Sequence, residues 1–308
     1  MKHISPINDF FFRYLFGKQG HEHLTLDFIN AVLEDAGMGP LQSLVIRNPF
    51  SPKESVTDKE CILDIKAEDE KARLYNIEMQ IQGNSTFTNR SLYYWAKTYV
   101  GQLGNGDSYE RLNPVICINV LDFILLTNIE SAHQCYMLRE LYSDAMVLTD
   151  HLMLHFLCLT RFKKMRTMIK IPLADWLSWF CYDEDNMKGL ETILERNDRI
   201  KEAHERYEQF TADRELMERY EARQKYLHDM ATFRQEAEEA RNRGFAEGKA
   251  EGKAEGKAEG KAEGKAEGKA EGDVERALKT AQIMKQNGEP LDKIVLYTGL
   301  SPKDIESI

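Results

Sequence analysis

The amino-acid sequence predicts an α/β or α+β fold in which helices flank a mixed β-sheet, followed by a long helical and low-complexity C-terminal tail. Two observations predict the folded part: short runs of alternating or β-branched apolar residues, and intervening segments with apolar residues at helical spacing. A third observation predicts the tail. From Leu194 to Arg243 the sequence contains no proline and no glycine, and six copies of the tetrapeptide EGKA follow from Glu247 to Ala270.

The N-terminal part begins with two helices and a strand. Apolar residues at helical spacing predict helices over residues 9–17 and 22–37, and Gly37 is the expected C-terminal stop of the second. The segment 41–50 has the composition of a strand that ends at Pro49.

Residues 61–82 form the next predicted element, a β-hairpin with a charged turn. If the hairpin is centred near Lys71, Asp64 lies directly across from Glu78 on the polar face. Facing like charges weaken a sheet by a few tenths of a kcal/mol up to roughly 1 kcal/mol. Two interpretations explain the pair: a solvated polar face on which Lys66 neutralises the acids, or a divalent cation held between the two carboxylates.

Alternating helical and extended patterns continue after the hairpin. A helix is expected over residues 86–103, with Asn89 as its N-cap. The nearly continuous β-branched run at 113–123 predicts a central strand that is buried on both faces. Two further strands and a short helix are expected over residues 133–141, 151–160 and 172–183.

Composition divides the chain into four predicted regions. The folded core is expected over residues 1–186, a charged helical region over 187–246, the EGKA spacer over 247–272 and a small C-terminal helical element over 273–308. In the spacer the four-residue repeat drifts about 40° per copy around a helix, and each glycine costs roughly 1 kcal/mol against alanine. The spacer is therefore expected to be a marginal helix or a solvated coil, and self-association is expected through the flanking C-terminal helices.

Charge and cysteine content limit the class of protein. The net charge of −10 over 308 residues argues against a general nucleic-acid coat protein, although it leaves room for a local basic cleft. No apolar run is long enough for a membrane span, and the N-terminus lacks a signal-peptide pattern. Five widely spaced cysteines, with no C-x-x-C, indicate reduced thiols in a cytoplasmic protein.

Several motifs follow one another in a fixed order along the chain. They are DFFFRYLFG at 9–17, an Asp on one strand followed by NIEMQ at 76–80, NRSLYYWAKTYVGQL at 89–103, PVICINVLDF at 114–123 and PLADWLSWF at 172–180. Together these motifs resemble one known family, the Rpn-type recombination-promoting nucleases, also called PD-(D/E)XK nuclease family transposases. The resemblance covers roughly residues 1–185. It implies a restriction-endonuclease-like core and DNA as the substrate.

The resemblance also implies a set of site residues. Asp64 and Glu78 take the places of the two acids that bind Mg²⁺ or Mn²⁺, and the backbone carbonyl of Met79 is a further ligand. Gln80 stands where the family pattern usually has lysine, and a glutamine cannot supply a positive charge. Lys66, two residues from Asp64 on the same face, is the candidate for the missing cation.

DNA is expected to be held by basic residues outside the hairpin. The acid-free segment 161–170 and the helix after the hairpin supply phosphate contacts that do not read sequence. The candidates for DNA binding are Arg90, Lys97, Arg161, Lys163, Lys164 and Arg166, with Asp9, Arg13 and Tyr94 as supporting residues.

These observations predict a cytoplasmic, Mg²⁺-dependent DNA endonuclease linked to recombination or mobile elements. Two other functions remain open at this point. Gln80 and the acidic surface are compatible with a catalytically silent relative that binds nucleic acid or regulates. The C-terminal helices by themselves are compatible with a self-assembling scaffold.

Overall fold

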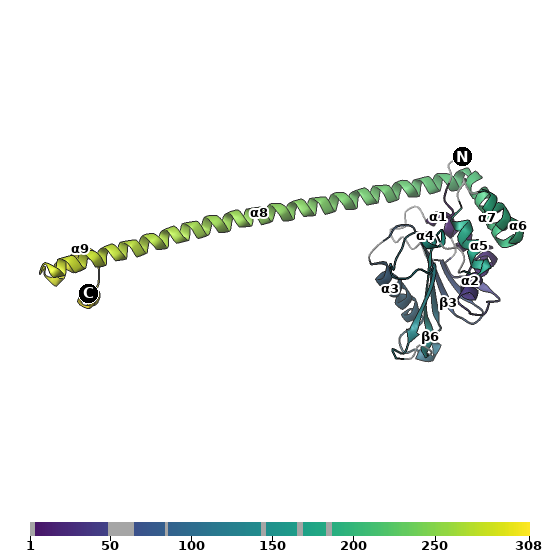
Figure 1. The fold of residues 1–308 in the computed structure, drawn as a ribbon, viewed down its shortest axis with the longest axis horizontal. Coiled ribbons are helices and arrows are strands. Elements are labelled where there is room, and N and C mark those ends of the chain that lie inside the picture. The colour runs from purple at the N-terminus through teal and green to yellow at the C-terminus, as the bar shows by residue number, and fades with distance from the viewer. Residues whose placement is uncertain (1–3, 49–64, 84–85, 143–145, 165–168, 183–186) are drawn as a thin grey trace. The chain divides into compact units, whose positions relative to one another are not determined.

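The computed structural model describes residues 4–48, 65–83, 86–142, 146–164, 169–182 and 187–308. These residues form two compact units, Met1–Leu227 and His228–Ile308. The sheet and its covering helices belong to the first unit, and the C-terminal helical element belongs to the second (Figure 1).

A mixed sheet is the centre of the N-terminal unit, and the described residues give it six strands in the order β1-β2-β3-β4-β6-β5. The β2–β3 hairpin is antiparallel, β3, β4 and β6 run parallel, and β5 returns antiparallel to β6 at the edge. This arrangement confirms the predicted mixed sheet. The strands are β1 Leu44–Ile46, β2 Ile65–Asp69, β3 Leu74–Gln80, β4 Val115–Leu121, β5 His133–Arg139 and β6 Val147–Cys158.

Helices cover both faces of the sheet. Three of them, α1 Asp9–Gly17, α2 Glu22–Asp35 and α5 Ile171–Phe180, supply the main apolar core on one face. The opposite face is covered by α3 Phe87–Val100, whose Phe87 lies in a second core cluster with residues of β4 and β6. All seven residues of β4 are buried, because alternate side chains enter the two clusters.

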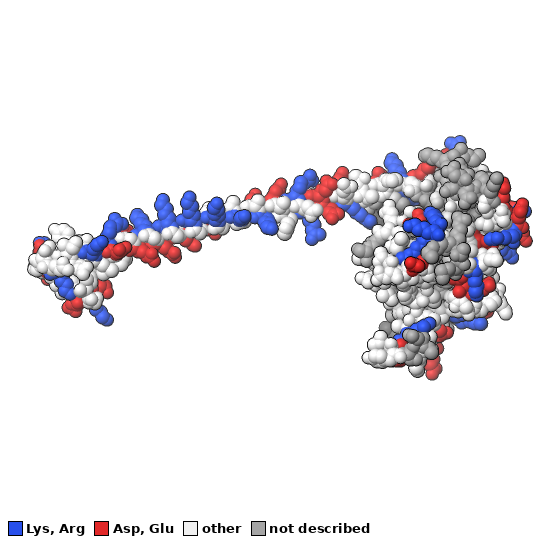
Figure 2. All heavy atoms as spheres, in the orientation of Figure 1, with Lys and Arg blue, Asp and Glu red and all other residues white. Residues whose placement is uncertain are grey.

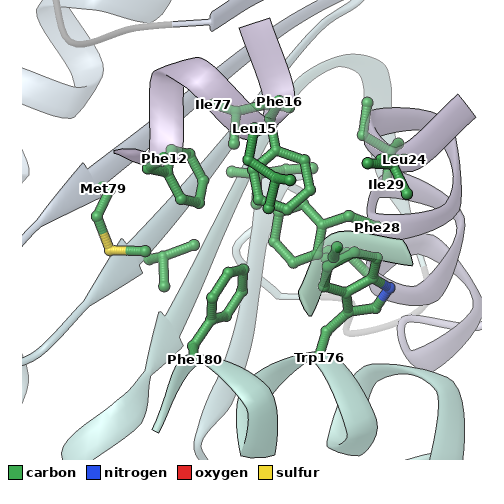
Figure 3. Close-up of a cluster of buried hydrophobic side chains, with 14 of the residues drawn as sticks. Phe12, Leu15, Phe16, Leu24, Phe28, Ile29, Ile77, Met79, Trp176 and Phe180 are labelled. Carbon is green, nitrogen blue, oxygen red and sulfur yellow. The ribbon is translucent and has the colours of Figure 1, made fainter. Parts of the chain in front are cut away.

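Aromatic side chains dominate the main core (Figure 3). The ring of Phe16 lies 5.3 Å from that of Phe28 and 5.4 Å from that of Trp176, centroid to centroid. From the sheet, Ile77 and Met79 point into the same cluster, as Figure 3 shows. Because neighbouring strand residues face opposite ways, the even-numbered residues of β3 are directed to the α3 face.

The N-terminal unit continues beyond the predicted boundary at residue 186. Helices α6 Met187–Arg196 and α7 Asp198–Ala212 follow α5, and Ile200 and Phe210 of α7 are completely buried in the main core. Arg223, in the first turns of α8, is 4% exposed and donates to Asp9 across 3.1 Å. Helices that were expected to be exposed therefore belong in part to the folded core.

Helix α8, Arg214–Gln286, continues for 73 residues through the EGKA tract. The tract is thus fully helical, and not the marginal helix or coil that was expected. Strong helix formers lie on both sides of it, so the helix extends into the tract without the cost of nucleating a new helix there. The residues of the tract are exposed. Glu and Lys, two positions apart, lie on opposite sides of the helix, as Figure 2 shows.

The C-terminal unit ends in two short helices, as expected. The helices α9 Leu291–Thr298 and α10 Pro302–Ser307 pack against the end of α8 around Ala281, Ile294 and Ile305. Two smaller elements of the N-terminal unit complete the described structure: the 3-10 helix η1 Tyr109–Arg111 and the short helix α4 Leu159–Phe162.

The N-cap expected for α3 is wrong. Helix α3 begins at Phe87 after Thr86, so Asn89 lies within the helix and is not its N-cap. The expected stop of α2 is confirmed, since Gly37 adopts a φ of 77° and its N–H donates to the carbonyl of Glu34.

Candidate functional site

The polar face of β3 is buried beneath α3. Asn76 and Glu78 are each 4% exposed, and Gln80 at the end of the strand is half-buried. The parallel register places Glu78 beside Asn119 of β4, which is 2% exposed and is reached by the hydroxyl of Ser91 from α3 at 3.4 Å. This face is thus not the solvated surface of the first interpretation.

Arg90 of α3 reaches down to this face. Its Nη2 group donates to Oε1 of Glu78 and to Oε1 of Gln80, so that one guanidinium joins the two predicted site residues. The guanidinium carbon lies 4.8 Å from the ring centroid of Phe87 and 5.9 Å from that of Tyr94. Two aromatic rings on the same helix therefore hold the arginine over the carboxylate.

The hairpin has the predicted register. Ile65 pairs with Ile77 and Lys66 with Asn76, which is the alignment assumed for the pair of facing acids. Asp64 itself lies outside the described residues. Lys66 is half-buried and stands opposite Asn76, whereas Arg90 forms an ion pair with Glu78.

Two buried polar atoms at this site have no hydrogen-bond partner among the described residues: Oδ1 of Asn76 and Nε of Arg90. Buried polar atoms normally find a partner in protein or ordered water. Asn76 lies two positions before Glu78 on the same face of β3. The site therefore has an acceptor and a donor available for further polar ligands.

The oxygen donors present fit a hard divalent cation. Glu78 offers a carboxylate, and Gln80 and Asn76 offer amide oxygens. Hard cations take oxygen ligands, and Mg²⁺ usually takes one or two carboxylates together with water and phosphate. The side chain of Met79 is buried in the main core, so only its backbone carbonyl stays a candidate ligand. Across the described part of the chain, no three His, Cys, Asp or Glu side chains cluster in a way that could hold a metal.

The carboxyl end of β4 borders the same site. The backbone N–H of Asp122 donates to the carbonyl of Gln80 at 3.0 Å, and the carboxylate of Asp122 lies 3.5 Å from Nζ of Lys163. Lys163 and Lys164 are exposed at the end of α4. These two lysines remain candidates for phosphate contacts.

The other predicted DNA-binding residues divide into three groups. Lys97 is exposed on α3. Arg161 is only 8% exposed and its Nη2 group donates to the carbonyl of Leu126, so this guanidinium serves the core and not a phosphate-binding surface. Arg166 lies outside the described residues.

The three supporting residues also take different positions. Asp9 begins α1, accepts the N–H of Phe10 at 2.8 Å and pairs with Arg223, so its contacts fasten α8 to α1. Arg13 is half-buried on α1. Tyr94 lies against Arg90 and so borders the site directly.

Sequence reasoning placed Arg90 among phosphate contacts and missed its position on Glu78. A signal was present, since Arg90 is the first cation of an acid-free helix that directly follows the strand of Glu78. A helix crossing back over the sheet brings its first turns close to the end of that strand.

A second buried polar cluster on the other face of the sheet was also missed. His133 Nδ1 lies 2.5 Å from Asp35, His133 Nε2 lies 3.0 Å from His155 Nδ1, and His155 Nε2 lies 3.8 Å from Cys135 Sγ. Burial, aided by the charge of His133, lowers the pKa of His155 to about 3. Burial raises the pKa of Asp35, but the hydrogen bonds from His133 and from the N–H of Lys170 outweigh it and leave the pKa low.

The family described as PD-(D/E)XK nuclease family transposase matches residues 6–237. The chain belongs to this family. The match confirms the resemblance and the PD-(D/E)XK-like α/β fold, and it covers β3, α3 and the first turns of α8. A PD-(D/E)XK transposase-family domain indicates a nuclease-type function linked to mobile elements.

Searches against curated proteins and solved structures gave no match. None of the helices in the described part of this PD-(D/E)XK family member is long and apolar enough to cross a membrane.

Proposed function

We propose that this PD-(D/E)XK family member is a Mg²⁺-dependent endonuclease that hydrolyses phosphodiester bonds in DNA. One observation carries the proposal: Arg90 of α3 donates to both Glu78 and Gln80 at the end of β3. The family pattern needs a cation where this chain has Gln80, and Arg90 provides one at that position. We therefore assign to Arg90 the role that sequence reasoning gave to Lys66.

Asp64, Glu78 and the backbone carbonyl of Met79 would hold the metal, which when bound lowers the pKa of water and stabilises charge on the phosphate. The protein groups do the positioning. Gln80 orients the attacking water or a phosphate oxygen through its amide. The guanidinium of Arg90 offers a planar set of donors to phosphate oxygens.

Arg90 has two states in this proposal. In the described form it forms an ion pair with the carboxylate of Glu78, whose side chain is 5% exposed. With Glu78 holding a metal, Arg90 would be available to donate to a phosphate oxygen. The same pair also supports the alternative of a catalytically silent relative, because a carboxylate that is permanently satisfied by arginine has no need of a metal.

DNA is the proposed partner of the exposed lysines Lys97, Lys163 and Lys164. We also propose a homo-oligomer formed through the C-terminal helices. Its support is the exposure of Ile283, Leu296 and Tyr297, which are 56%, 80% and 70% exposed. Cys117, Cys135, Cys158 and Cys181 are free thiols, which is consistent with the cytoplasmic location we propose.

Nicking of supercoiled plasmid tests the function. The full chain is incubated with Mg²⁺ or Mn²⁺ beside Glu78→Gln, which keeps the shape and a hydrogen-bond acceptor for Arg90 but removes the charge. Metal-dependent nicking by the wild type and its loss in Glu78→Gln are expected. If the wild type and Glu78→Gln nick equally, Glu78 is not part of the active site. If neither protein nicks the plasmid but both bind DNA, the result supports the catalytically silent relative.

A further inference from the structure

One face of α3 is exposed beside the proposed site. Tyr93 is 62% exposed and Val100 is 69% exposed, and Asn89 and Lys97 lie on the same stripe at helical spacing. The other side of the helix is occupied by packing: Trp95 stacks on Tyr99 at 5.0 Å. The hydroxyl of Tyr99 in turn lies 2.9 Å from His151, so these two rings serve the core while Tyr93 does not.

The charge of α3 is unusual for this chain. Its sequence FTNRSLYYWAKTYV contains Arg90 and Lys97 and no acidic residue, although the whole chain has a net charge of −10. An acid-free helix that alternates cations with aromatic rings is complementary to a polyanion with flat bases. This charge pattern favours nucleic acid over an apolar protein partner.

Aromatic rings connect the exposed face to the buried carboxylate. Glu78 is bound by Arg90, whose guanidinium lies against the ring of Tyr94. The ring of Tyr94 is 5.9 Å from that of Tyr93, at an interplanar angle of 59°. A ligand that contacts Tyr93 is therefore separated from Arg90 by one side chain.

We propose that the exposed face of α3 binds single-stranded DNA, with Tyr93 stacking on an unpaired base next to the cleaved phosphate. The inference rests on the proposed nuclease function and specifies its substrate class. In duplex DNA the base faces are covered by neighbouring base pairs, so an exposed tyrosine ring finds no face to stack on. Single strands, flaps and bubbles present such faces, and Lys97 contacts the backbone one turn further along α3.

Fluorescence anisotropy tests the proposal without cleavage. The full chain is titrated in EDTA against labelled oligothymidylate and against a labelled duplex of equal length. Base–aromatic stacking of about 1–3 kcal/mol converts to a loss of roughly 5- to 150-fold in affinity for the single strand in Tyr93→Ala. Tyr93→Phe should bind as the wild type does, and Val100→Ala is the matched control on the same stripe.

Three results would overturn the inference: unchanged affinity in Tyr93→Ala, an equal loss for single strand and duplex, or tighter binding of oligouridylate than of oligothymidylate. Lys97→Ala provides an independent check, since loss of a phosphate contact lowers the slope of log affinity against log salt by about 0.7 for a single strand, whereas Tyr93→Ala leaves the slope unchanged. These outcomes do not depend on nicking. If the chain does not nick DNA but Tyr93→Ala still weakens binding of the single strand, only the proposed endonuclease function is rejected.

Discussion

Arg90 and Glu78 form an ion pair between α3 and β3 in which the carboxylate side chain is 5% exposed. The sequence alone led to the expectation of two facing acids that repel each other across the hairpin. The structure supplies Glu78 with a cation from a different element, so its charge is balanced without a metal. Removal of Glu78 should thus weaken the fold, not relieve it.

Glu78→Ala is expected to abolish nicking and to lower the free energy of unfolding by about 1–3 kcal/mol, because it leaves the Arg90 guanidinium without its carboxylate. Glu78→Gln should lose nicking with a smaller loss of stability. Thermal melting of the two variants beside the wild type measures the difference. An alanine variant that melts at or above the wild-type temperature would show that the ion pair does not stabilise the fold.

Arg90→Ala is expected to reduce the nicking rate by about 100- to 1000-fold, the usual effect of removing one donor to developing negative charge. It should also bind Mn²⁺ more tightly, because the arginine no longer competes for Glu78. Titration calorimetry with Mn²⁺ measures this second effect without any cleavage. Lys97→Ala, an exposed cation on the same helix, is the control that should leave Mn²⁺ binding unchanged.

Gln80→Lys is expected to reduce nicking, although it restores the residue that the family pattern usually has. The Oε1 atom of Gln80 accepts a hydrogen bond from Arg90, and a lysine there would replace an acceptor by a second cation. Nicking rates of Gln80→Lys and Gln80→Glu separate the two effects, since glutamate keeps the acceptor. A lysine variant that is faster than the wild type would mean that Arg90 leaves Gln80 in the active form.

Local patterns were sufficient to predict the elements of the sheet. Alternation predicted the hairpin and its register, and the continuous apolar run of β4 predicted a strand buried on both faces. Family motifs indicated Glu78 and Gln80. These features depend on residues close together in the chain, which is why periodicity and motif spacing report them.

Long-range contacts were not predictable in the same way. The pairing of Arg223 with Asp9 joins residues 214 positions apart, and the burial of Ile200 and Phe210 depends on how α7 meets α1. The charged composition of that region indicates exposed helices, since most of its residues are polar and only one stripe is apolar. Arg90 was identified as a cation near the site, but its carboxylate partner depends on how α3 lies over β3.

Acid should destabilise the fold partly through His155. Its folded pKa of about 3 lies below the ordinary value of 6.5, so between these values the unfolded chain takes up a proton that the folded chain does not. Stability is therefore lost as the pH falls from about 6.5 toward 3. His155→Gln should show a smaller fall in melting temperature between pH 7 and pH 5 than the wild type.

His155→Gln has to be compared with the wild type because other buried histidines also lower the stability of the fold in acid. Burial also lowers the pKa of His21 and of His204. The matched control is His228→Gln on the exposed surface of α8, which should keep the wild-type pH dependence. An identical fall in melting temperature for His155→Gln and the wild type would contradict the assignment of this pH dependence to His155.

Shortening the EGKA tract should leave the N-terminal unit unchanged. The tract is exposed throughout, and added carbon atoms at its glycines would meet nothing within 4 Å. Deletion of three of the six copies is therefore expected to keep the melting temperature and the nicking rate of the unassembled chain, and to alter only the assembled form.

A chain ending at residue 237 should melt as the full chain does, whereas one ending at residue 186 should fail to fold because it lacks the buried residues of α7. Calorimetric melting of the four chains makes the comparison. If the three-copy chain and the chain ending at residue 237 both melt several degrees lower than the full chain, the tract stabilises the N-terminal unit and its role as a spacer would be rejected.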